Sequence, residues 1–89
     1  MIFEFTTNGE RTLDLLDKAI SQRIIRKLLY WEKSPKPLTY AKPIEGYPFY
    51  RFRVGDYRVI IKPDPVRRVI RILRVGHRKN IYKNLGELL

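Results

Sequence analysis

The sequence has no cysteine, a single histidine and no long apolar run. Without cysteine the chain has neither a disulfide framework nor a thiolate metal site, which is compatible with a reducing cytoplasm. No apolar segment reaches the roughly eighteen residues that a membrane-spanning helix needs. The first ten residues, MIFEFTTNGE, lack the basic start and apolar core of a signal peptide. These absences predict a soluble, cytoplasmic protein that does not work at a membrane.

Clustered carboxylates and glycine-rich phosphate loops are also missing. The nine Asp and Glu residues are scattered along the chain, and none is placed with the histidine as metal ligands usually are. A nuclease that uses divalent metals needs clustered carboxylates. Nucleoside-triphosphate chemistry usually needs a glycine-rich loop ahead of a helix. Neither class is indicated, and the sequence predicts no metal site and no cofactor.

Positive charge, in contrast, is abundant and unevenly distributed. The formal net charge is +10 over 89 residues. Residues 1–17 carry a net charge of −3, whereas residues 51–83 carry eleven Lys or Arg against two Asp, a net of +9. Solubility could explain the size of the charge but not its asymmetry. Because concentrated positive charge is typical of proteins that bind polyanions, we expect a nucleic-acid partner.

The first third of the chain has the pattern of one strand and two helices. Residues 1–6 alternate as a short strand does. Apolar side chains then recur at spacings of four and three, at Leu13, Leu16, Ile20, Ile24, Leu28 and Trp31. This stripe predicts helices over residues 8–16 and 18–32, with a break near Asp17 and with Asn8 as a weak candidate for the N-cap.

Prolines end the second helix, and three strands follow them. The segment SPKP at residues 34–37 stops the helix, and a proline-bearing connection runs to residue 48. Strands are expected over residues 50–54, 57–61 and 69–75, followed by a short helix or partly ordered tail from residue 79. The order strand, helix, helix, strand, strand, strand predicts an α+β fold. In it, the N-terminal helical pair packs on one face of a small antiparallel sheet.

The segment YRFRVGDYR, residues 50–58, places three arginines in one predicted hairpin. Glycine accepts the positive φ that tight hairpin turns demand, so Gly55 and Asp56 form the turn. This turn sets Arg53 opposite Arg58 and puts Arg51 on the same face. Opposed like charges destabilise a sheet by up to about 1 kcal/mol, a cost that an anionic ligand would remove. A solvated charged face is an equally supported alternative at this point.

Few other groups could take part in chemistry: Arg78, Tyr82 and the single histidine, His77. A lone histidine or tyrosine is more often structural than catalytic. RNA, however, carries its own nucleophile, the 2′-hydroxyl, and guanidinium groups can hold phosphate oxygens and stabilise charge in the transition state. Proton transfer is the difficult step, because the pKa of arginine is above about 12. It would need Tyr82, His77, water or a strongly perturbed arginine.

Two segments together resemble the RelE/ParE superfamily of bacterial and archaeal toxins, most closely its RelE branch. They are EGYPFYRFRVGDYRVII, residues 45–61, and RVGHRKNIYKNL, residues 74–85. The signature is basic-x-basic ahead of Gly-x-Tyr-Arg, followed by Gly-His-Arg-Lys and a downstream tyrosine. The resemblance covers nearly the whole chain and implies a single RelE-like toxin domain over residues 1–89.

Members of the RelE branch cleave mRNA in the ribosomal A site, without metal, through attack by the 2′-hydroxyl. The resemblance therefore implies the toxin of a type II toxin–antitoxin system, a ribosome-dependent endoribonuclease or mRNA interferase that acts on the 70S ribosome with its mRNA. It also implies a co-encoded antitoxin that wraps and inactivates the toxin. Operator DNA would be bound only by the toxin–antitoxin complex.

The resemblance assigns catalytic roles to five residues. Arg51 and Arg53 match two basic positions that are often lysines in relatives, where one is proposed as the base and the other as a stabiliser of the transition state. Arg58 matches the arginine that grips the region of the scissile phosphate. Arg78 matches the one that stabilises the leaving side or acts as acid. Tyr82 resembles the tyrosine that stacks on the substrate or orients it.

Other residues and other functions stay open on the sequence. His77 occupies a position that is lysine in some relatives and is a further candidate, and Lys62, Lys79 and Lys83 are expected to bind RNA. One alternative is a ParE-like inhibitor of DNA gyrase that cleaves nothing. Another is a non-catalytic basic module that binds nucleic acid through phosphate contacts, with an affinity that falls steeply with salt.

Overall fold

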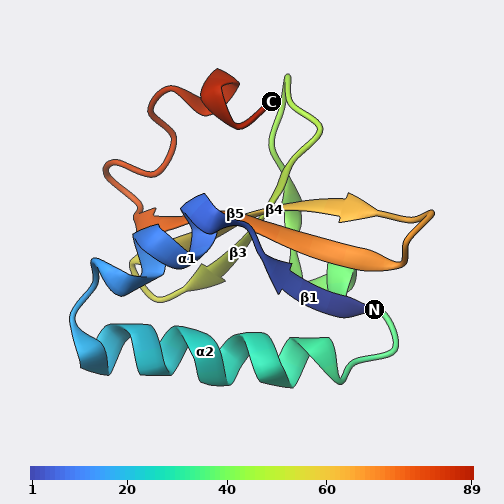
Figure 1. Cartoon of the computed structure of the whole chain (residues 1–89), viewed down its shortest axis with the longest axis horizontal. Coiled ribbons are helices and arrows are strands. Elements are labelled where there is room, and N and C mark those ends of the chain that lie inside the picture. The colour runs from blue at the N-terminus through green and yellow to red at the C-terminus, as the bar shows by residue number, and fades with distance from the viewer.

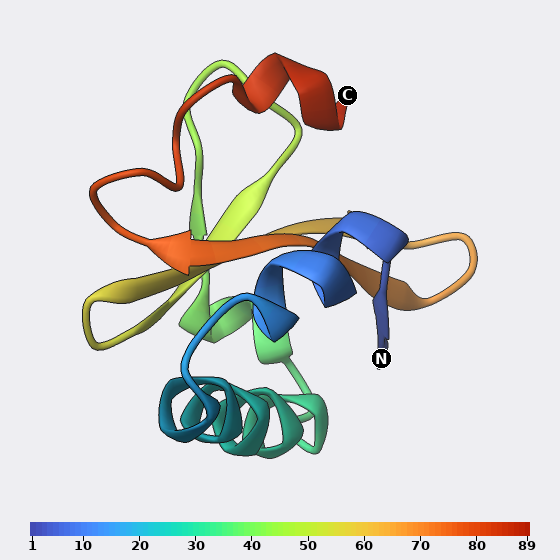
Figure 2. The same cartoon turned by 60° about the vertical axis from the view of Figure 1, so that its left-hand side comes forward.

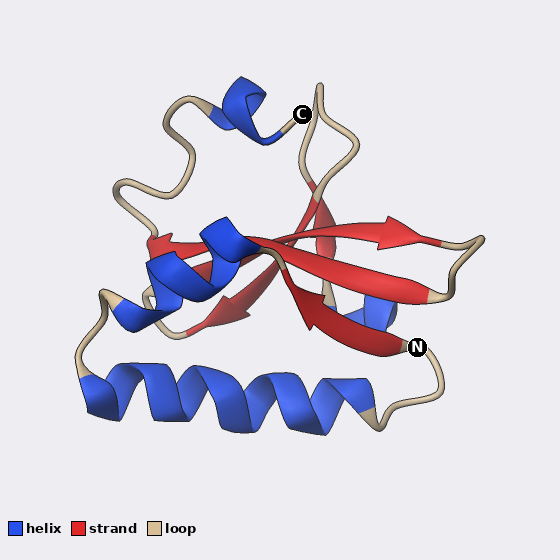
Figure 3. Cartoon of the chain, viewed as in Figure 1, coloured by secondary structure: helices blue, strands red, loops and turns tan.

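A five-stranded sheet with the strand order β1-β5-β4-β3-β2 lies at the centre of the computed structural model, which describes residues 1–89 (Figures 1 and 3). Its strands are β1 (Ile2–Phe5), β2 (Lys42–Pro43), β3 (Tyr50–Val54), β4 (Tyr57–Asp64) and β5 (Val69–His77). Strand β1 pairs with β5 in parallel, and the other three pairs are antiparallel. The predicted α+β class is confirmed.

The helices α1 (Thr7–Asp14) and α2 (Lys18–Glu32) follow β1, and Figure 2 shows both on the same side of the sheet. Helix α1 begins one residue earlier than the predicted range, and its N-cap lies two residues earlier than predicted. The hydroxyl of Thr6 accepts the N–H of Gly9 at 3.0 Å and caps the helix. The prediction of Asn8 as the cap was wrong, because its side chain instead donates to the carbonyl of Leu73 at 2.7 Å. Neither helix is long and apolar enough to cross a membrane.

The main core lies between this helical pair and the sheet. It contains Leu13, Ile24, Leu28, Trp31, Phe52, Val54, Val59, Ile61, Ile70, Ile72 and Val75. The apolar stripe predicted from helical spacing supplies the first four, so that prediction is confirmed. Full burial of one large apolar side chain stabilises the fold by about 1.5–3 kcal/mol. Burial of these side chains therefore holds both helices against one face of the sheet. The helices do not cover the opposite face of β3 and β4.

A second, smaller core lies on that opposite face. The connection between β2 and β3 runs beside the C-terminal segment there (Figures 1 and 2). The two segments pack against the sheet through Ile44, Phe49, Ile60, Leu73, Ile81 and Leu85. The C-terminal segment ends in a short 3₁₀ helix, η2 (Leu85–Leu88). Of the two predicted alternatives for the tail, the short helix is therefore the observed one.

A β-bulge in β5 turns Arg74 toward the C-terminal segment, and hydrogen bonds from Arg74 hold that segment to the sheet. Ile60 pairs with Arg74, while the next residue of β4 pairs two positions earlier, which leaves Leu73 as an extra residue in β5. Leu73 and Arg74 therefore both reach the side of the second core. The Arg74 guanidinium donates to the carbonyls of Ile81 at 3.1 Å and Lys83 at 2.6 Å.

The sheet differs from the predicted one at both of its edges. The predicted connection after the second helix contains the 3₁₀ helix η1 (Pro37–Tyr40) and the edge strand β2. A two-residue strand that contains proline carries too little pattern to be recognised in a sequence. At the other edge β1 is parallel to its neighbour, so the sheet is mostly, but not wholly, antiparallel. Alternation identifies a strand but does not identify its partner.

Candidate nucleic-acid interface

The hairpin arginines line a shallow cavity of about 170 Å³. The register confirms that they share a face, since Arg53 pairs with Arg58 and Arg51 lies two residues before Arg53. Lys42, which pairs with Arg51, and Tyr40 complete the lining. The cavity therefore brings four cationic side chains together on the face of β3 that the helices leave open.

Backbone carbonyl groups hold the three guanidinium groups. The carbonyl of Gly55 accepts from Arg53 Nε at 3.4 Å and from Arg58 Nη1 at 2.9 Å. The carbonyl of Pro43 accepts from Arg51 Nη1 at 3.1 Å. The ion pairs of the chain join other residues. No carboxylate therefore neutralises the charges of the cavity, which would attract an anion.

The hairpin turn itself depends on Gly55. Its φ of +59° lies in the left-handed region, which glycine adopts without the clash that a side chain would cause. The two-residue turn predicted from the sequence is confirmed by the pairing of Val54 with Tyr57. A methyl group added to this glycine would lie 3.0 Å from the guanidinium of Arg23, a residue of α2. Arg23 therefore adds a further positive charge at the hairpin tip.

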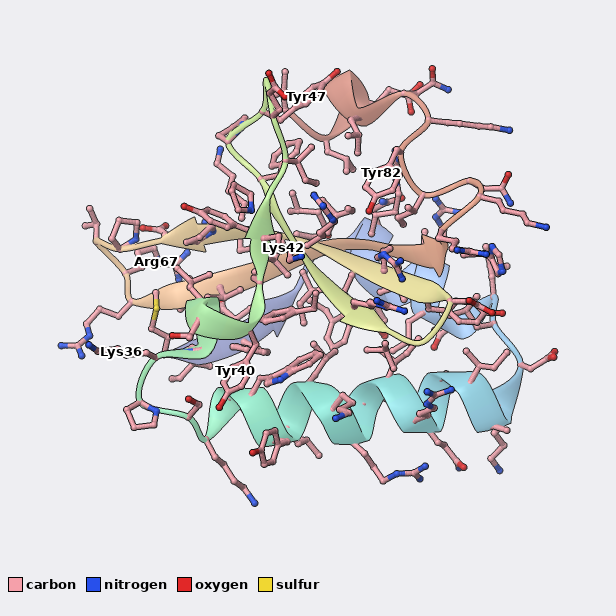
Figure 4. The ribbon with its side chains drawn as sticks, turned by 180° about the vertical axis from the view of Figure 1, so that it is seen from behind. Lys36, Tyr40, Lys42, Tyr47, Arg67 and Tyr82 are labelled. Atoms are coloured by element: carbon pink, nitrogen blue, oxygen red, sulfur yellow. The ribbon has the colours of Figure 1, made fainter.

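Tyr82 reaches the same face from the C-terminal segment. The guanidinium carbon of Arg51 lies 5.9 Å from the centre of the Tyr82 ring. The residues on either side of Tyr82 are the two whose carbonyls accept from Arg74. In Figure 4, Tyr82 and Tyr40 lie on opposite sides of Lys42. The cations of the cavity therefore have a phenol on each side.

Arg78 and His77 lie at the end of β5, beside the hairpin turn. The backbone N–H of Arg78 donates to the carbonyl of Asp56 at 2.8 Å, and its Nε lies 3.8 Å from the carboxylate of the same residue. The Arg78 side chain is 57% exposed and could reach a ligand held at the hairpin. His77 pairs with Tyr57 and meets its ring edge-on at 5.3 Å. Because Tyr57 packs against the main core, His77 faces the helical side of the sheet, away from the cavity.

The three lysines predicted to bind RNA do not line the cavity. Lys62 lies on β4, four residues beyond Arg58 on the same face, which corresponds to about 13 Å along a strand. Lys79 and Lys83 are exposed on the C-terminal segment, one on each side of Tyr82 in the sequence. Their role in RNA binding stays a prediction.

Sequence reasoning missed three residues of this region. Tyr40 and Lys42 lie in η1 and β2, and the short segment between prolines gives no periodicity that would have placed them beside Arg51. Arg74 was missed because the bulge that turns it toward the C-terminal segment leaves no signal in the alternation of β5. Only the pairing of β2 with β3 and the position of the bulge would have revealed them.

The sheet end opposite the hairpin turn carries a different charged group, Asp64. The backbone N–H of Arg67 donates to its carboxylate at 3.1 Å, and the Arg71 guanidinium lies 3.0 Å from it. These two donors hold the pKa of Asp64 below its ordinary value of 3.8. No three His, Asp or Glu residues lie together where they could bind a metal ion. The cavity at the hairpin presents cationic side chains and the phenol of Tyr40.

Known proteins resemble the chain over most of its length. Residues 3–82 match the family model described as the ParE toxin of the type II toxin-antitoxin system parDE. The chain is 32% identical over 81 residues to the toxin RelG of Mycobacterium tuberculosis, which covers 89% of this chain and 92% of that protein. Two solved toxin–antitoxin complexes contain a similar chain. They are RelBE2 from Mycobacterium tuberculosis (30% identity, TM-score 0.72, 86% and 96% coverage) and RelB–RelE from Methanococcus jannaschii (31%, 0.70, 88% and 93%).

Proposed function

The chain belongs to the ParE/RelE superfamily of type II toxins, and on this premise we propose that it is an mRNA interferase of the RelE type. In this proposal the toxin enters the A site of the 70S ribosome in the cytoplasm and cleaves the mRNA bound there. The observation that carries the proposal is the convergence of Arg51, Arg53, Arg58 and Lys42 on one cavity that has Tyr82 at its side.

The cavity is suited to a phosphodiester and, still more, to its transition state. A phosphodiester carries one negative charge, and attack by a deprotonated 2′-oxygen adds a second. Guanidinium groups donate to phosphate oxygens in a planar fork, and the three arginines are already positioned by backbone carbonyls. Preorganised donors of this kind contribute roughly 100- to 1,000-fold each to a rate. We assign Arg51, Arg53 and Arg58 to this stabilisation, and Lys42 to binding the neighbouring backbone.

The proposed reaction needs two proton transfers. The 2′-oxygen attacks the adjacent phosphorus and the bond from phosphorus to the 5′-oxygen breaks, which leaves a 2′,3′-cyclic phosphate and a 5′-hydroxyl. The 2′-hydroxyl must lose a proton and the leaving 5′-oxygen must gain one. An arginine does not accept a proton near neutral pH. A neutral phenol is no better as a base, so we assign acceptance of the first proton to water, with Tyr82 orienting the substrate. Arg78 stabilises the leaving 5′-oxygen, which takes its proton from water. His77, on the other face of the sheet, has no part in this scheme.

We also propose that a co-encoded antitoxin holds this toxin inactive. The two solved relatives at 30% and 31% identity are complexes with their antitoxins. The net charge of +10 would favour an acidic partner chain that covers the cavity and neutralises it. Operator DNA would then be bound only by the complex. Co-expression of the chain with the neighbouring reading frame should restore growth and yield a co-purifying complex.

A short induction of the chain in growing cells tests the proposed function. We expect protein synthesis to stop before DNA synthesis does, with new mRNA 5′ ends inside coding regions. Chromosomal double-strand breaks with intact mRNA would instead indicate a ParE-like inhibitor of DNA gyrase. Neither kind of break, together with RNA binding that falls steeply with salt, would indicate a non-catalytic basic module.

A further inference from the structure

We propose that Tyr40 is a stacking platform for one base of the single-stranded mRNA, next to the cavity that holds the phosphate. The inference rests on the proposed function for the identity of the nucleic acid. It adds a second aromatic position to the site, on the side of the cavity away from Tyr82. The position is formed by η1 and α2, outside the hairpin and outside the C-terminal segment.

Tyr40 belongs to two adjoining hollows in the surface. Its side chain lines the cavity of the cationic residues. It also borders a second depression, together with Tyr30, Lys33, Ser34 and Pro35. Tyr40 is 46% exposed, so much of its side chain is open to a ligand. A nucleotide whose phosphate lies in the first hollow can therefore place a base against the ring that separates the two.

The Tyr40 ring is held in place by aromatic side chains that lead out of the main core. Phe52 is fully buried, and Trp31 stacks on it with ring centres 4.3 Å apart and an interplanar angle of 12°. Tyr40 in turn stacks on Trp31 at 6.3 Å and 29°, and the ring of Tyr30 meets it edge-on at 6.3 Å. A ring supported in this way loses little conformational freedom when a base stacks on it.

The charges around this aromatic group also suit RNA. Lys33 lies in the second depression and Lys42 in the first. Lys27 lies 5.9 Å from the ring centres of both Tyr30 and Trp31. Glu32, the one acidic residue of α2, is turned away toward β1, where it accepts the N–H of Phe3 at 2.7 Å. Exposed aromatic rings beside a basic groove are the combination that binds single-stranded nucleic acids.

Binding of short, uncleavable RNA to the native chain tests this inference without ribosomes. The probe is a fluorescein-labelled heptamer of 2′-O-methyladenosine, which lacks the attacking hydroxyl, and its partner is a heptamer of the same backbone with abasic units. Fluorescence anisotropy gives the dissociation constant. We expect Tyr40→Leu to weaken binding of the intact heptamer by roughly 5- to 150-fold, the range for loss of one stacked base. Binding of the abasic heptamer should not change, and Tyr40→Trp should retain the affinity of the native chain.

Tyr47→Leu is the matched control. Tyr47 is also exposed, at 38%, and stacks on a buried ring, that of Phe49, at 5.8 Å and 7°. It lies on the connection before β3, far from Tyr40 in Figure 4, and its loss should leave the affinity unchanged. The proposal is overturned if Tyr40→Leu binds the intact heptamer as Tyr47→Leu does, if it loses equal affinity for the abasic heptamer, or if the native chain does not prefer the intact one. Because no cleavage is measured, a toxin that failed to cut mRNA on ribosomes would leave this result standing.

Discussion

Arg53 and Arg58 face each other across the hairpin and donate to the same acceptor, the carbonyl oxygen of Gly55. The shared carbonyl oxygen is neutral, so it does not balance the positive charges of the two guanidinium groups. A phosphate would offer them further oxygens and would remove the repulsion between them. This relationship explains why a small sheet keeps opposed arginines at a paired position, and it makes the hairpin the first target for mutation.

Arg58→Ala should abolish growth inhibition and leave the fold intact. The side chain donates only to backbone carbonyls of its own hairpin, at Gly55 and Tyr57, so its removal leaves no buried charge unpaired. Loss of one preorganised donor should lower the rate of mRNA cleavage by roughly 100- to 1,000-fold. Growth after induction and the cleavage rate on ribosomes give the two readings, and circular dichroism verifies the fold.

The control for this variant is Arg67→Ala. Arg67 carries the same charge but lies in the exposed turn between β4 and β5, at the end of the sheet away from the hairpin. A general loss of positive charge would weaken both variants equally. Equal weakening, or full toxicity of Arg58→Ala, would remove Arg58 from the site.

Arg78→Ala should also abolish growth inhibition, because the proposed mechanism uses Arg78 to stabilise the leaving 5′-oxygen. Its side chain is mostly exposed and its contact with Asp56 is a long surface ion pair, which contributes at most about 1 kcal/mol. The melting temperature should therefore stay close to that of the native chain while cleavage is lost. Arg78→Lys keeps the positive charge but loses the planar pair of donors of the guanidinium group, so we expect intermediate activity. Native activity in Arg78→Ala would show that the assignment of the leaving side is wrong.

Gly9→Ala should destabilise the fold, because α1 crosses β5 with almost no space at this residue. A methyl group there would collide with the backbone carbonyl of Ile72, which cannot move without disturbing the strand. Overpacking of this kind costs about 1–3 kcal/mol, and in a chain of this size each kcal/mol lowers the melting temperature by roughly 4–8 °C. Gly86→Ala is the control, since its methyl group would meet open space. Equal melting temperatures for the two variants would contradict the close approach.

The turn after β4 should give an acid-sensitive contribution to stability. The pKa of Asp64 is lowered, first by the backbone N–H of Arg67 and then by the Arg71 guanidinium. A lowered pKa in the folded state means that the stabilisation is complete above the ordinary pKa near 3.8 and is lost as the pH falls through the lowered value. The melting temperature of Asp64→Asn should therefore lie below that of the native chain by a constant amount from pH 5 to pH 8. The gap should close as the pH falls below about 4. A gap that persists at pH 2 would argue against this ionisation as its cause.

Local rules in the sequence were enough for the hairpin and the helices. A two-residue turn at Gly55 and Asp56 leaves one register, so the shared face of Arg53 and Arg58 followed directly. The face of His77 did not follow. Counting by two from Leu73 would place His77 on the face of the second core, but the bulge shifts the alternation and turns it to the helices.

The remaining part of the site depends on contacts between segments that are distant in sequence. Tyr40 and Lys42 reach the arginines only because β2 pairs with β3, and a pairing of two residues leaves no periodic pattern. Tyr82 reaches Arg51 because the C-terminal segment packs in the second core and is held by Arg74. Neither contact has a local signal in the sequence. The predicted site residues therefore include the arginines and Tyr82 but not Tyr40 and Lys42.

Primer extension on an mRNA bound to programmed 70S ribosomes, with the purified chain added in the presence of EDTA, tests the central claim most directly. We expect cuts within the A-site codon for the native chain, a 2′,3′-cyclic phosphate on the upstream fragment, and no cuts for Arg58→Ala or Arg78→Ala. Intact mRNA with the native chain, under conditions in which the same chain arrests growth in cells, would contradict the claim. The arginine cavity would then be a binding surface rather than a site of RNA cleavage.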